Sequence, residues 1–134
     1  MSALTVLDAS AVLAFLQGEP GNEVVRLALQ NEQCVVTAAN EAEIISKALD
    51  KGISAEVLEG ILRELGYEVI GVSPADGNLA GNIRTETRDI GLSLGDRICL
   101  ACAKRLKAKV ITADRPWLNV AARLELNILC IRPN

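Results

Sequence analysis

Short apolar runs and apolar stripes of helical spacing alternate along the chain. The runs have the length and the β-branched content of buried strands, and they are expected at 4–7, 34–37, 68–72, 109–112 and 127–131. Apolar residues recur every three or four positions in the segments between them, which predicts helices at 10–17, 23–30, 39–51, 54–64, 74–89, 93–106 and 116–124. This alternation predicts an α/β fold, a three-layer sandwich with a largely parallel sheet and helices on both faces.

Three of the expected helices carry apolar stripes that predict which side of each helix is buried. The expected inward residues are Val24, Leu27 and Ala28; Ile44, Ile45, Ala48 and Leu49; and Val57, Leu58, Ile61 and Leu62. The first and third of these helices could bury their stripes inside the monomer or present them to a partner, and periodicity does not choose between the two.

Composition fits one domain over residues 1–134 with an aliphatic core. Half of the residues are hydrophobic, and the chain contains one Phe, one Trp and one Tyr. The core must therefore be built from Ala, Val, Ile and Leu, which suits helices packed on a parallel sheet. So few aromatic residues weigh against stacking platforms for single-stranded bases.

The chain contains no histidine, which excludes Ser-His-Asp and Cys-His catalysis and His-ligated zinc. Its four cysteines fall inside apolar stripes or strand-like runs, so we expect reduced, buried thiols, and a redox or zinc role for Cys99-x-x-Cys102 is the weaker interpretation. With no signal peptide and no membrane-spanning run in the sequence, we expect a cytoplasmic protein.

Four acidic residues occupy positions where a strand is expected to end or a helix to begin: Asp8, Glu43, Asp96 and Asp114. In parallel α/β folds the C-terminal strand ends meet at one crevice, where ligands bind. Carboxylates gathered there repel each other unless a hard cation such as Mg²⁺ or Mn²⁺ neutralises them. The pattern therefore indicates metal-assisted chemistry on phosphate.

Each acid also has a purely structural interpretation. Asp8 and Asp114 have the positions of helix N-caps, the latter beside Pro116. Ser93-x-x-Asp96 has the form of a capping box, and Glu43 could be a solvated helix residue. These alternatives stay open for the single residues, but they do not explain why all four acids are expected at or near one edge.

Charge is distributed unevenly along the chain, although the net charge is only −3. Residues 1–83 hold 4 Lys and Arg against 12 Asp and Glu, whereas residues 84–134 hold 10 against 5. This asymmetry suggests a basic face beside an acidic site, an arrangement that can bind a phosphate backbone. The candidates for such contacts are Arg84, Arg88, Arg97 and Arg115.

Four stretches of sequence resemble the PIN-domain ribonucleases, and among them the VapC-type toxins of toxin–antitoxin systems. They are Val-Leu-Asp-Ala-Ser-Ala at 6–11, Asn-Glu-Ala-Glu at 40–43, Gly-Leu-Ser-Leu-Gly-Asp-Arg-Ile-Cys-Leu-Ala at 91–101 and Val-Ile-Thr-Ala-Asp-Arg-Pro-Trp at 110–117. Their order and spacing match over nearly the whole chain. The Leu-Gly-Asp-Arg and Thr-Ala-Asp-x-x-Trp pieces are specific when taken together.

This resemblance implies a metal-dependent endoribonuclease whose four acids, given above, are the catalytic and metal-binding residues. Ser10, Asn40 and Thr112 match polar positions that support such a centre. Glu41 departs from the usual neutral residue, and because its helical phase directs it elsewhere we assign Glu43 to the site. The resemblance also implies an RNA substrate, a small cognate antitoxin and a homodimer. The rival interpretation is a non-catalytic PIN-like module that only binds protein or RNA.

Overall fold

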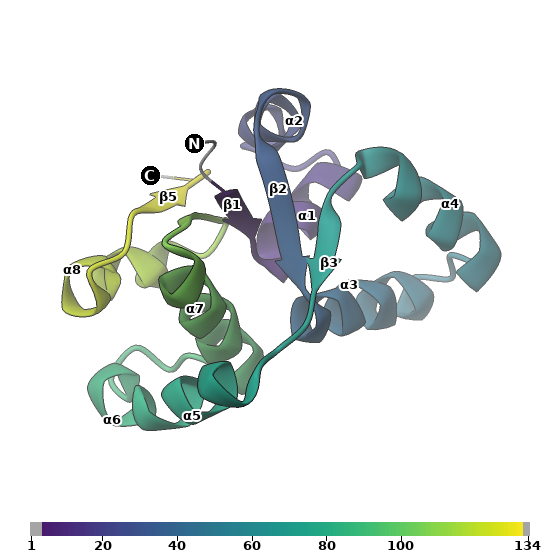
Figure 1. Ribbon diagram of the computed structural model, residues 1–134. Coiled ribbons are helices and arrows are strands. Elements are labelled where there is room, and N and C mark those ends of the chain that lie inside the picture. Colours follow the sequence, from purple (N-terminus) through teal and green to yellow (C-terminus); the bar gives the residue numbers. More distant parts are fainter. Residues whose placement is uncertain (1–3, 133–134) are drawn as a thin grey trace.

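The computed structural model describes residues 4–132, and its centre is a five-stranded, entirely parallel sheet (Figure 1). The strands are β1 (Leu4–Leu7), β2 (Gln33–Thr37), β3 (Glu68–Ile70), β4 (Lys109–Thr112) and β5 (Ile128–Cys130). They lie side by side in the order β3-β2-β1-β4-β5. The α/β class and the parallel sheet predicted from sequence are therefore confirmed.

Helices fill the connections between the strands. They are α1 (Ala9–Leu16), α2 (Asn22–Asn31), α3 (Ala38–Asp50), α4 (Ala55–Leu65), α5 (Pro74–Asn82), α6 (Arg84–Thr87), α7 (Leu94–Leu106) and α8 (Ala121–Leu124), with the 3₁₀ helix η1 (Arg115–Asn119) before α8.

Two of the helices predicted from sequence are interrupted in the structure. The segment 74–89 divides at Ile83 into α5 and α6, just after Gly81 and Asn82, two residues of low helix propensity. The segment 116–124 begins as η1, with i→i+3 bonds that include Val120 N–H to the Trp117 carbonyl at 3.1 Å. The Trp117 side chain of that turn is completely buried.

Alternate residues of the strands face two separate apolar layers. One layer packs Leu7, Val36 and Ile111 against α1 to α4. The other packs Val6, Val35 and Val110 against α7, η1 and α8. Figure 1 shows α7, α5 and α6 to one side of the sheet, α3 and α4 to the other side, α1 behind it and α2 beside the upper end of β2. This arrangement is the predicted three-layer sandwich.

The predicted apolar stripes are correct in part. In α2, Val25 and Ala28 are buried while Val24 and Leu27 are 36% and 48% exposed, so the predicted face was rotated by about one residue. In α4, Leu58 and Leu62 are buried, whereas Val57 and Ile61 remain exposed. Leu49 at the end of α3 is exposed as well.

An ion pair between the exposed Arg105 and the buried Asp76 joins α5 to α7. The Asp76 carboxylate accepts bonds from Arg105 at 2.7 and 2.9 Å and from the Ser73 backbone N–H at 2.9 Å. Arg105 holds the pKa of Asp76 well below its ordinary value, although burial acts in the opposite direction. Asp76 is 1% exposed, so this contact fixes α5 against the helix whose N-terminus reaches the site.

All four cysteines are buried free thiols, as expected: Cys34, Cys99, Cys102 and Cys130. Burial raises the pKa of Cys34 to about 11 and that of Cys102 to about 12. Such thiols are protonated at neutral pH and are poor nucleophiles. Across residues 4–132, no helix combines the length and the apolar character needed to cross a bilayer.

Candidate active site

The order of the strands reverses between β1 and β4, and the candidate site lies at the C-terminal ends of these two strands. The chain runs outward from β1 to β2 and β3, then returns to place β4 on the other side of β1. Crevices at such switch points are the usual ligand sites of open α/β sheets. Asp8 follows β1 directly, and Asp114 comes two residues after the end of β4.

A cavity of about 440 Å³ at this edge brings the four predicted acids together: Asp8, Glu43, Asp96 and Asp114. Ser10, Ser93, Lys47 and Arg132 also line it. Glu43 comes from the second turn of α3 and Asp96 from the first turn of α7. Residues more than a hundred positions apart in sequence thus share one polar cavity.

Asp8 is the most enclosed of the four acids, at 3% exposure. Its carboxylate accepts bonds from Thr112 Oγ1 at 2.6 Å, from Ser10 Oγ at 2.8 Å and from the Ala11 backbone N–H at 2.8 Å. Burial raises the pKa of Asp8 to about 7 in spite of these hydrogen bonds, which lower it. The structural interpretation also holds, because the bond from Ala11 caps α1.

Ser10 and Thr112 tie the two strand ends to each other. Ser10 Oγ accepts the Ala113 backbone N–H at 2.9 Å, and Thr112 Oγ1 accepts the Asp114 backbone N–H at 3.0 Å. The two hydroxyls lie 3.2 Å apart. They therefore hold Asp8 in one rotamer and position the turn that carries Asp114.

Asn40 and Gly95 position Glu43. Asn40 Nδ2 donates to Glu43 Oε1 at 2.9 Å and reaches the Gly95 carbonyl at 3.4 Å, which links α3 to α7. A Cβ atom built on Gly95 would overlap with the Glu43 carboxylate. Glycine at this position of α7 therefore makes room for Glu43 to lie against the start of the helix that carries Asp96.

Asp96 belongs to a complete capping box and to the cavity at once. Ser93 N–H donates to its carboxylate at 3.0 Å, and Ser93 Oγ accepts the Asp96 backbone N–H at 3.1 Å. Burial raises the pKa of Asp96, and the negative charges of Glu43 and Asp114 act in the same direction, while the bonds to Ser93 lower it. These charges are thus close enough to repel.

Unlike Asp8 and Asp96, Asp114 has no capping role through its side chain. It precedes η1, but its carboxylate makes no capping hydrogen bond. The side chain is exposed at the mouth of the cavity. Capping therefore does not account for the acid at this position.

The donor chemistry of the cavity fits a hard divalent cation. Within residues 4–132, no three carboxylate or thiol groups are close enough together to ligate one ion with the side chains as they stand. Four carboxylates nevertheless share the cavity, and charge repulsion contributes to the raised pKa of Asp96. Asn40 Oδ1 beside Glu43 is buried with no hydrogen-bond partner in the described part of the chain. Oxygen donors of these kinds suit Mg²⁺ or Mn²⁺.

The structure distributes the four arginines predicted to contact RNA among different environments. Arg97 is 7% exposed and donates to the Ala80 carbonyl at 2.8 Å, so its guanidinium holds α7 to α5 and is not available for RNA. Arg84 and Arg88 are exposed but line another cavity, which shares no lining residue with the acidic one. Only Arg115, exposed beside Asp114, adjoins the site.

Sequence reasoning missed two basic residues that line the acidic cavity, Lys47 and Arg132. Lys47 is one turn after Glu43 on α3, so the i, i+4 spacing was a signal that could have found it. Arg132 follows β5, and nothing in its local sequence indicates that it reaches this cavity. By contrast, the choice between Glu41 and Glu43 is supported, because the Glu41 carboxylate turns away to accept the Tyr67 hydroxyl at 2.6 Å.

The sequence model of the PIN-domain family matches residues 5–123, which is nearly all of the described chain. The chain belongs to the PIN-domain family. No curated protein sequence matches it.

Solved structures share the fold of this PIN domain at low sequence identity. VapBC2 from Rickettsia felis, bound to a promoter DNA fragment, matches with a TM-score of 0.71 at 17% identity, over 95% of this chain and 98% of that one. A toxin–antitoxin complex from Klebsiella pneumoniae matches with a TM-score of 0.71 at 15% identity, over 95% of this chain and 97% of that one. VapBC-1 from nontypeable Haemophilus influenzae matches with a TM-score of 0.70 at 18% identity, over 96% of this chain and 98% of that one.

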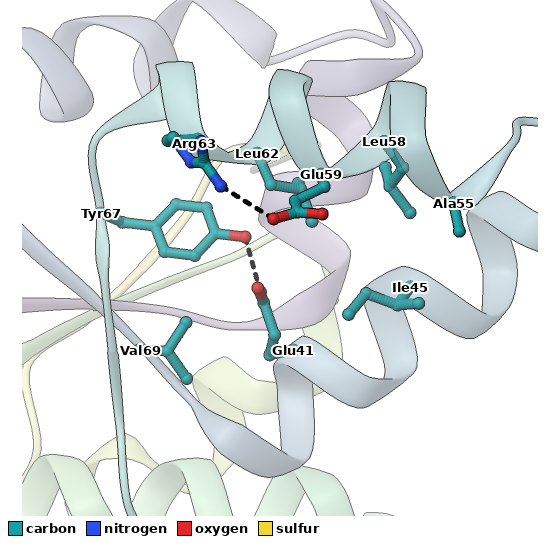
Figure 2. A pocket seen from close by; sticks show the side chains of 9 residues that line it. All are labelled: Glu41, Ile45, Ala55, Leu58, Glu59, Leu62, Arg63, Tyr67 and Val69. Atoms are coloured by element: carbon teal, nitrogen blue, oxygen red, sulfur yellow. Dashed lines mark hydrogen bonds and ion pairs between the residues drawn. The ribbon is translucent and has the colours of Figure 1, made fainter.

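The PIN domain also has a more apolar groove, of about 480 Å³, between α3, α4 and β3 (Figure 2). Ile45, Leu58, Leu62 and Val69 contribute its apolar wall. Its polar groups are paired, Tyr67 with Glu41 and Arg63 with Glu59 at 2.8 Å. β3 is an edge strand, so no further strand of the described sheet lies beyond this groove.

Proposed function

We propose that this PIN domain is a metal-dependent endoribonuclease and the toxin of a toxin–antitoxin pair. The observation that carries the proposal is the cavity in which four carboxylates gather at the switch point of the sheet. Membership of the PIN-domain family supports nuclease chemistry. Solved toxin–antitoxin complexes of the same fold support the toxin assignment.

Each acid has a stated role in this proposal. Asp8, Glu43, Asp96 and Asp114 would hold Mg²⁺ or Mn²⁺, directly or through water, with Asp8 as the central ligand. The bound metal would lower the pKa of a water molecule and offset charge that develops on the phosphate. No histidine is present to act as a general base, which is why the carboxylate cavity has to supply this chemistry.

The remaining residues of the site act by positioning. Ser10 and Thr112 hold the Asp8 carboxylate through hydrogen bonds of 2.8 and 2.6 Å, and Asn40 holds Glu43 at 2.9 Å. The enclosure of Asp8 strengthens electrostatic interactions at that point because water is excluded. Since water is the proposed nucleophile, the ribose 2′-hydroxyl takes no part and the products carry 5′-phosphate and 3′-hydroxyl ends.

The replacement Asp96→Asn tests the nuclease assignment. Asparagine retains much of the N-terminal capping capacity at this position but removes the charge. We expect Asp96→Asn to melt close to the wild type and to lose Mg²⁺-dependent RNA cleavage. Asp89→Asn is the matched control, because Asp89 is exposed and lies outside the cavity. A folded Asp96→Asn protein that still cleaves RNA with Mg²⁺ would show that the site is assigned wrongly.

We further propose that an amphipathic helix of the cognate antitoxin occupies the groove between α3, α4 and β3. The apolar wall suits such a helix, and Glu41 and Glu59 on its border suit basic residues beside the apolar face. A basic side chain from the same antitoxin that reached the carboxylate cavity would compete with the metal.

A pair of valine replacements tests this docking site. Val69 lines the groove and is 44% exposed, whereas Val72 is 38% exposed and lies outside it. We expect Val69→Glu to prevent co-purification with the antitoxin encoded by a neighbouring gene, and Val72→Glu to preserve it. Equal retention of the antitoxin by both variants would exclude the groove. Normal growth of cells that express the chain alone would contradict the toxin assignment.

Two further properties belong to the proposal, a homodimeric state and a cytoplasmic location. The four buried free thiols support a reducing compartment. Exposed apolar residues on α2 and α4, such as Leu27 and Val57, support association through some part of the surface.

A further inference from the structure

Two basic side chains lie in a cavity that is otherwise dominated by acids. Lys47 and Arg132 line the same space as the four carboxylates. If the cavity served only to hold a cation, positive side chains beside the carboxylates would weaken its binding. They are explained if an anion occupies the cavity together with the cation, as a phosphodiester would.

Arg132 also lines two cavities that adjoin the acidic one. The first, of about 440 Å³, shares Ser10, Lys47 and Arg132 with the site and continues toward Gln17 and Lys51; we call it the α1-side cavity. The second, of about 600 Å³, shares Ala113, Asp114 and Arg132 with the site and continues along η1; we call it the η1-side cavity. The cavity with the carboxylates thus shares lining residues with a neighbouring cavity on each side.

We propose that Lys47 and Arg132 bind the phosphates that flank the scissile one, and that a single RNA strand crosses the site from the η1-side cavity to the α1-side cavity. This inference rests on the proposed nuclease function and assigns the path of its substrate. Arg115 lies at the η1 end of the path and Lys51 at the α1 end, so basic residues occur along its whole length.

Local contacts hold Arg132 over the centre of this path. Its Nη2 donates to Glu19 at 2.8 Å and its Nε to the Pro20 carbonyl at 3.3 Å. Within residues 4–132 these two nitrogens carry its hydrogen bonds, which leaves Nη1 for a phosphate. The pair with Glu19 is 36% and 42% exposed, so it positions the guanidinium without strongly neutralising it.

A hydrogen-bonded chain continues from this pair across the α1-side cavity. With the Gln17 amide oriented to satisfy both of its neighbours, its nitrogen donates to Glu19 at 3.1 Å and its oxygen accepts from Lys51 Nζ at 3.1 Å. Lys51, Gln17, Glu19 and Arg132 are therefore connected. The two ends of this hydrogen-bonded series, Lys51 and Arg132, are cationic groups on the proposed path.

The path reads the backbone of the strand and not its bases. None of the residues that line the three cavities is aromatic, so they offer no aromatic ring on which a base could stack. Contacts to phosphate position a strand but carry no sequence information. Arg84 and Arg88 take no part, because their cavity shares no lining residue with any of the three.

Two double variants with equal loss of charge test the path: Lys47→Gln with Arg132→Gln, and Arg84→Gln with Arg88→Gln. A short fluorescent single-stranded RNA is titrated with each protein over a series of monovalent salt concentrations, with a fixed low concentration of Ca²⁺ in place of Mg²⁺ so that a hard cation can occupy the carboxylate cavity. Gels confirm that the strand stays intact. Each phosphate contact contributes about 0.7 to the slope of log K against log salt for single strands. We expect the slope to fall by about 1.4 for the first variant and to stay unchanged for the second.

A slope that is unchanged in the first variant, or reduced only in the second, would overturn the path, as would a wild type that binds no RNA. If Arg132→Gln impairs folding, Lys47→Gln alone, on the exposed face of α3, is expected to reduce the slope by about 0.7. The nuclease proposal fails separately. If the slope falls as expected in the first variant but the wild type does not cleave RNA with Mg²⁺, the result supports the path and contradicts the proposed nuclease activity.

Discussion

At the scale of single residues, Gly95 shows how closely the site is packed. A methyl group at this position would overlap with the Glu43 carboxylate, whose flexible side chain can move aside. We expect Gly95→Ala to change the free energy of unfolding by less than about 1 kcal/mol, since alanine favours helices. RNA cleavage should fall on the order of 100-fold, because displacement of a catalytic group by about 1 Å has effects of that size.

The matched control for this replacement is Gly60→Ala in α4, where the added methyl group would meet open space. It should retain full activity and gain a little stability. If Gly95→Ala cleaves RNA as fast as Gly60→Ala does, then Glu43 is not held by the close approach of the two helices, or it is not needed for the reaction.

The gathering of the four acids in one cavity was predictable from sequence, because Asp8, Asp96 and Asp114 stand beside strand ends or a helix start that the topology brings to one edge. Their role in catalysis stays a prediction. The sequence also indicated that Glu43 and not Glu41 faces this edge. It could not place Arg97 or Arg132. Arg97 follows Asp96 directly, yet the helix turns its side chain into the core, toward the Ala80 carbonyl. Arg132 reaches the site only through tertiary contacts with Glu19 and Pro20.

At the scale of secondary-structure elements, the Asp76–Arg105 ion pair is one of the polar contacts between α5 and α7, with the bond from Arg97 to the Ala80 carbonyl. We expect Asp76→Asn to lower the free energy of unfolding by about 2 to 3 kcal/mol at pH 7, since it removes charge-assisted bonds to a buried carboxylate. The exposed pair of Asp89 with Arg123 gives the control, and Asp89→Asn should cost less than about 1 kcal/mol. Chemical denaturation measures both values.

The pH dependence of the same pair has a definite sign. Because the folded-state pKa of Asp76 is lowered, its stabilising contribution is present above its ordinary pKa of 3.8 and is lost as the pH falls below it. The difference in stability between the wild type and Asp76→Asn should therefore shrink in acid below about pH 4. A difference that stayed constant down to the lowest pH would mean that the Asp76 charge contributes nothing.

Element order was predictable because apolar runs and helical stripes mark the strands and helices directly. The exact buried faces were less so. In α2, Val24, Val25 and Leu27 are all apolar, and only packing of α2 on α1 selects Val25. The break at Ile83 follows two residues of low helix propensity, and the segment from Arg115 begins as a 3₁₀ helix. Apolar periodicity reports neither feature.

At the scale of the whole molecule, folding mixes the acidic and basic halves of the chain. Lys109 pairs with Glu32 at 2.9 Å and Arg105 pairs with the buried Asp76 at 2.7 Å, so acids of the first half neutralise part of the basic excess after residue 83. The charge asymmetry of the sequence therefore overstates the basic face. After these ion pairs are taken into account, a small group of basic side chains remains around the carboxylates of the site.

The mass in solution tests the proposed dimer. The exposed apolar residues on α2 and α4 favour association, and we expect light scattering at micromolar concentration to give about twice the chain mass of 14.3 kDa. A mass near 14.3 kDa under these conditions would reject the dimer and leave the nuclease assignment intact.

The central claim is that the four carboxylates make this PIN domain a metal-dependent ribonuclease, and the ends of its products test that claim most directly. Purified protein is incubated with single-stranded RNA and Mg²⁺ or Mn²⁺, with and without EDTA, and the new ends are identified enzymatically. The account predicts cleavage that EDTA stops, with 5′-phosphate and 3′-hydroxyl ends. Cleavage in EDTA that leaves 2′,3′-cyclic phosphates, or no cleavage with either metal, would contradict it.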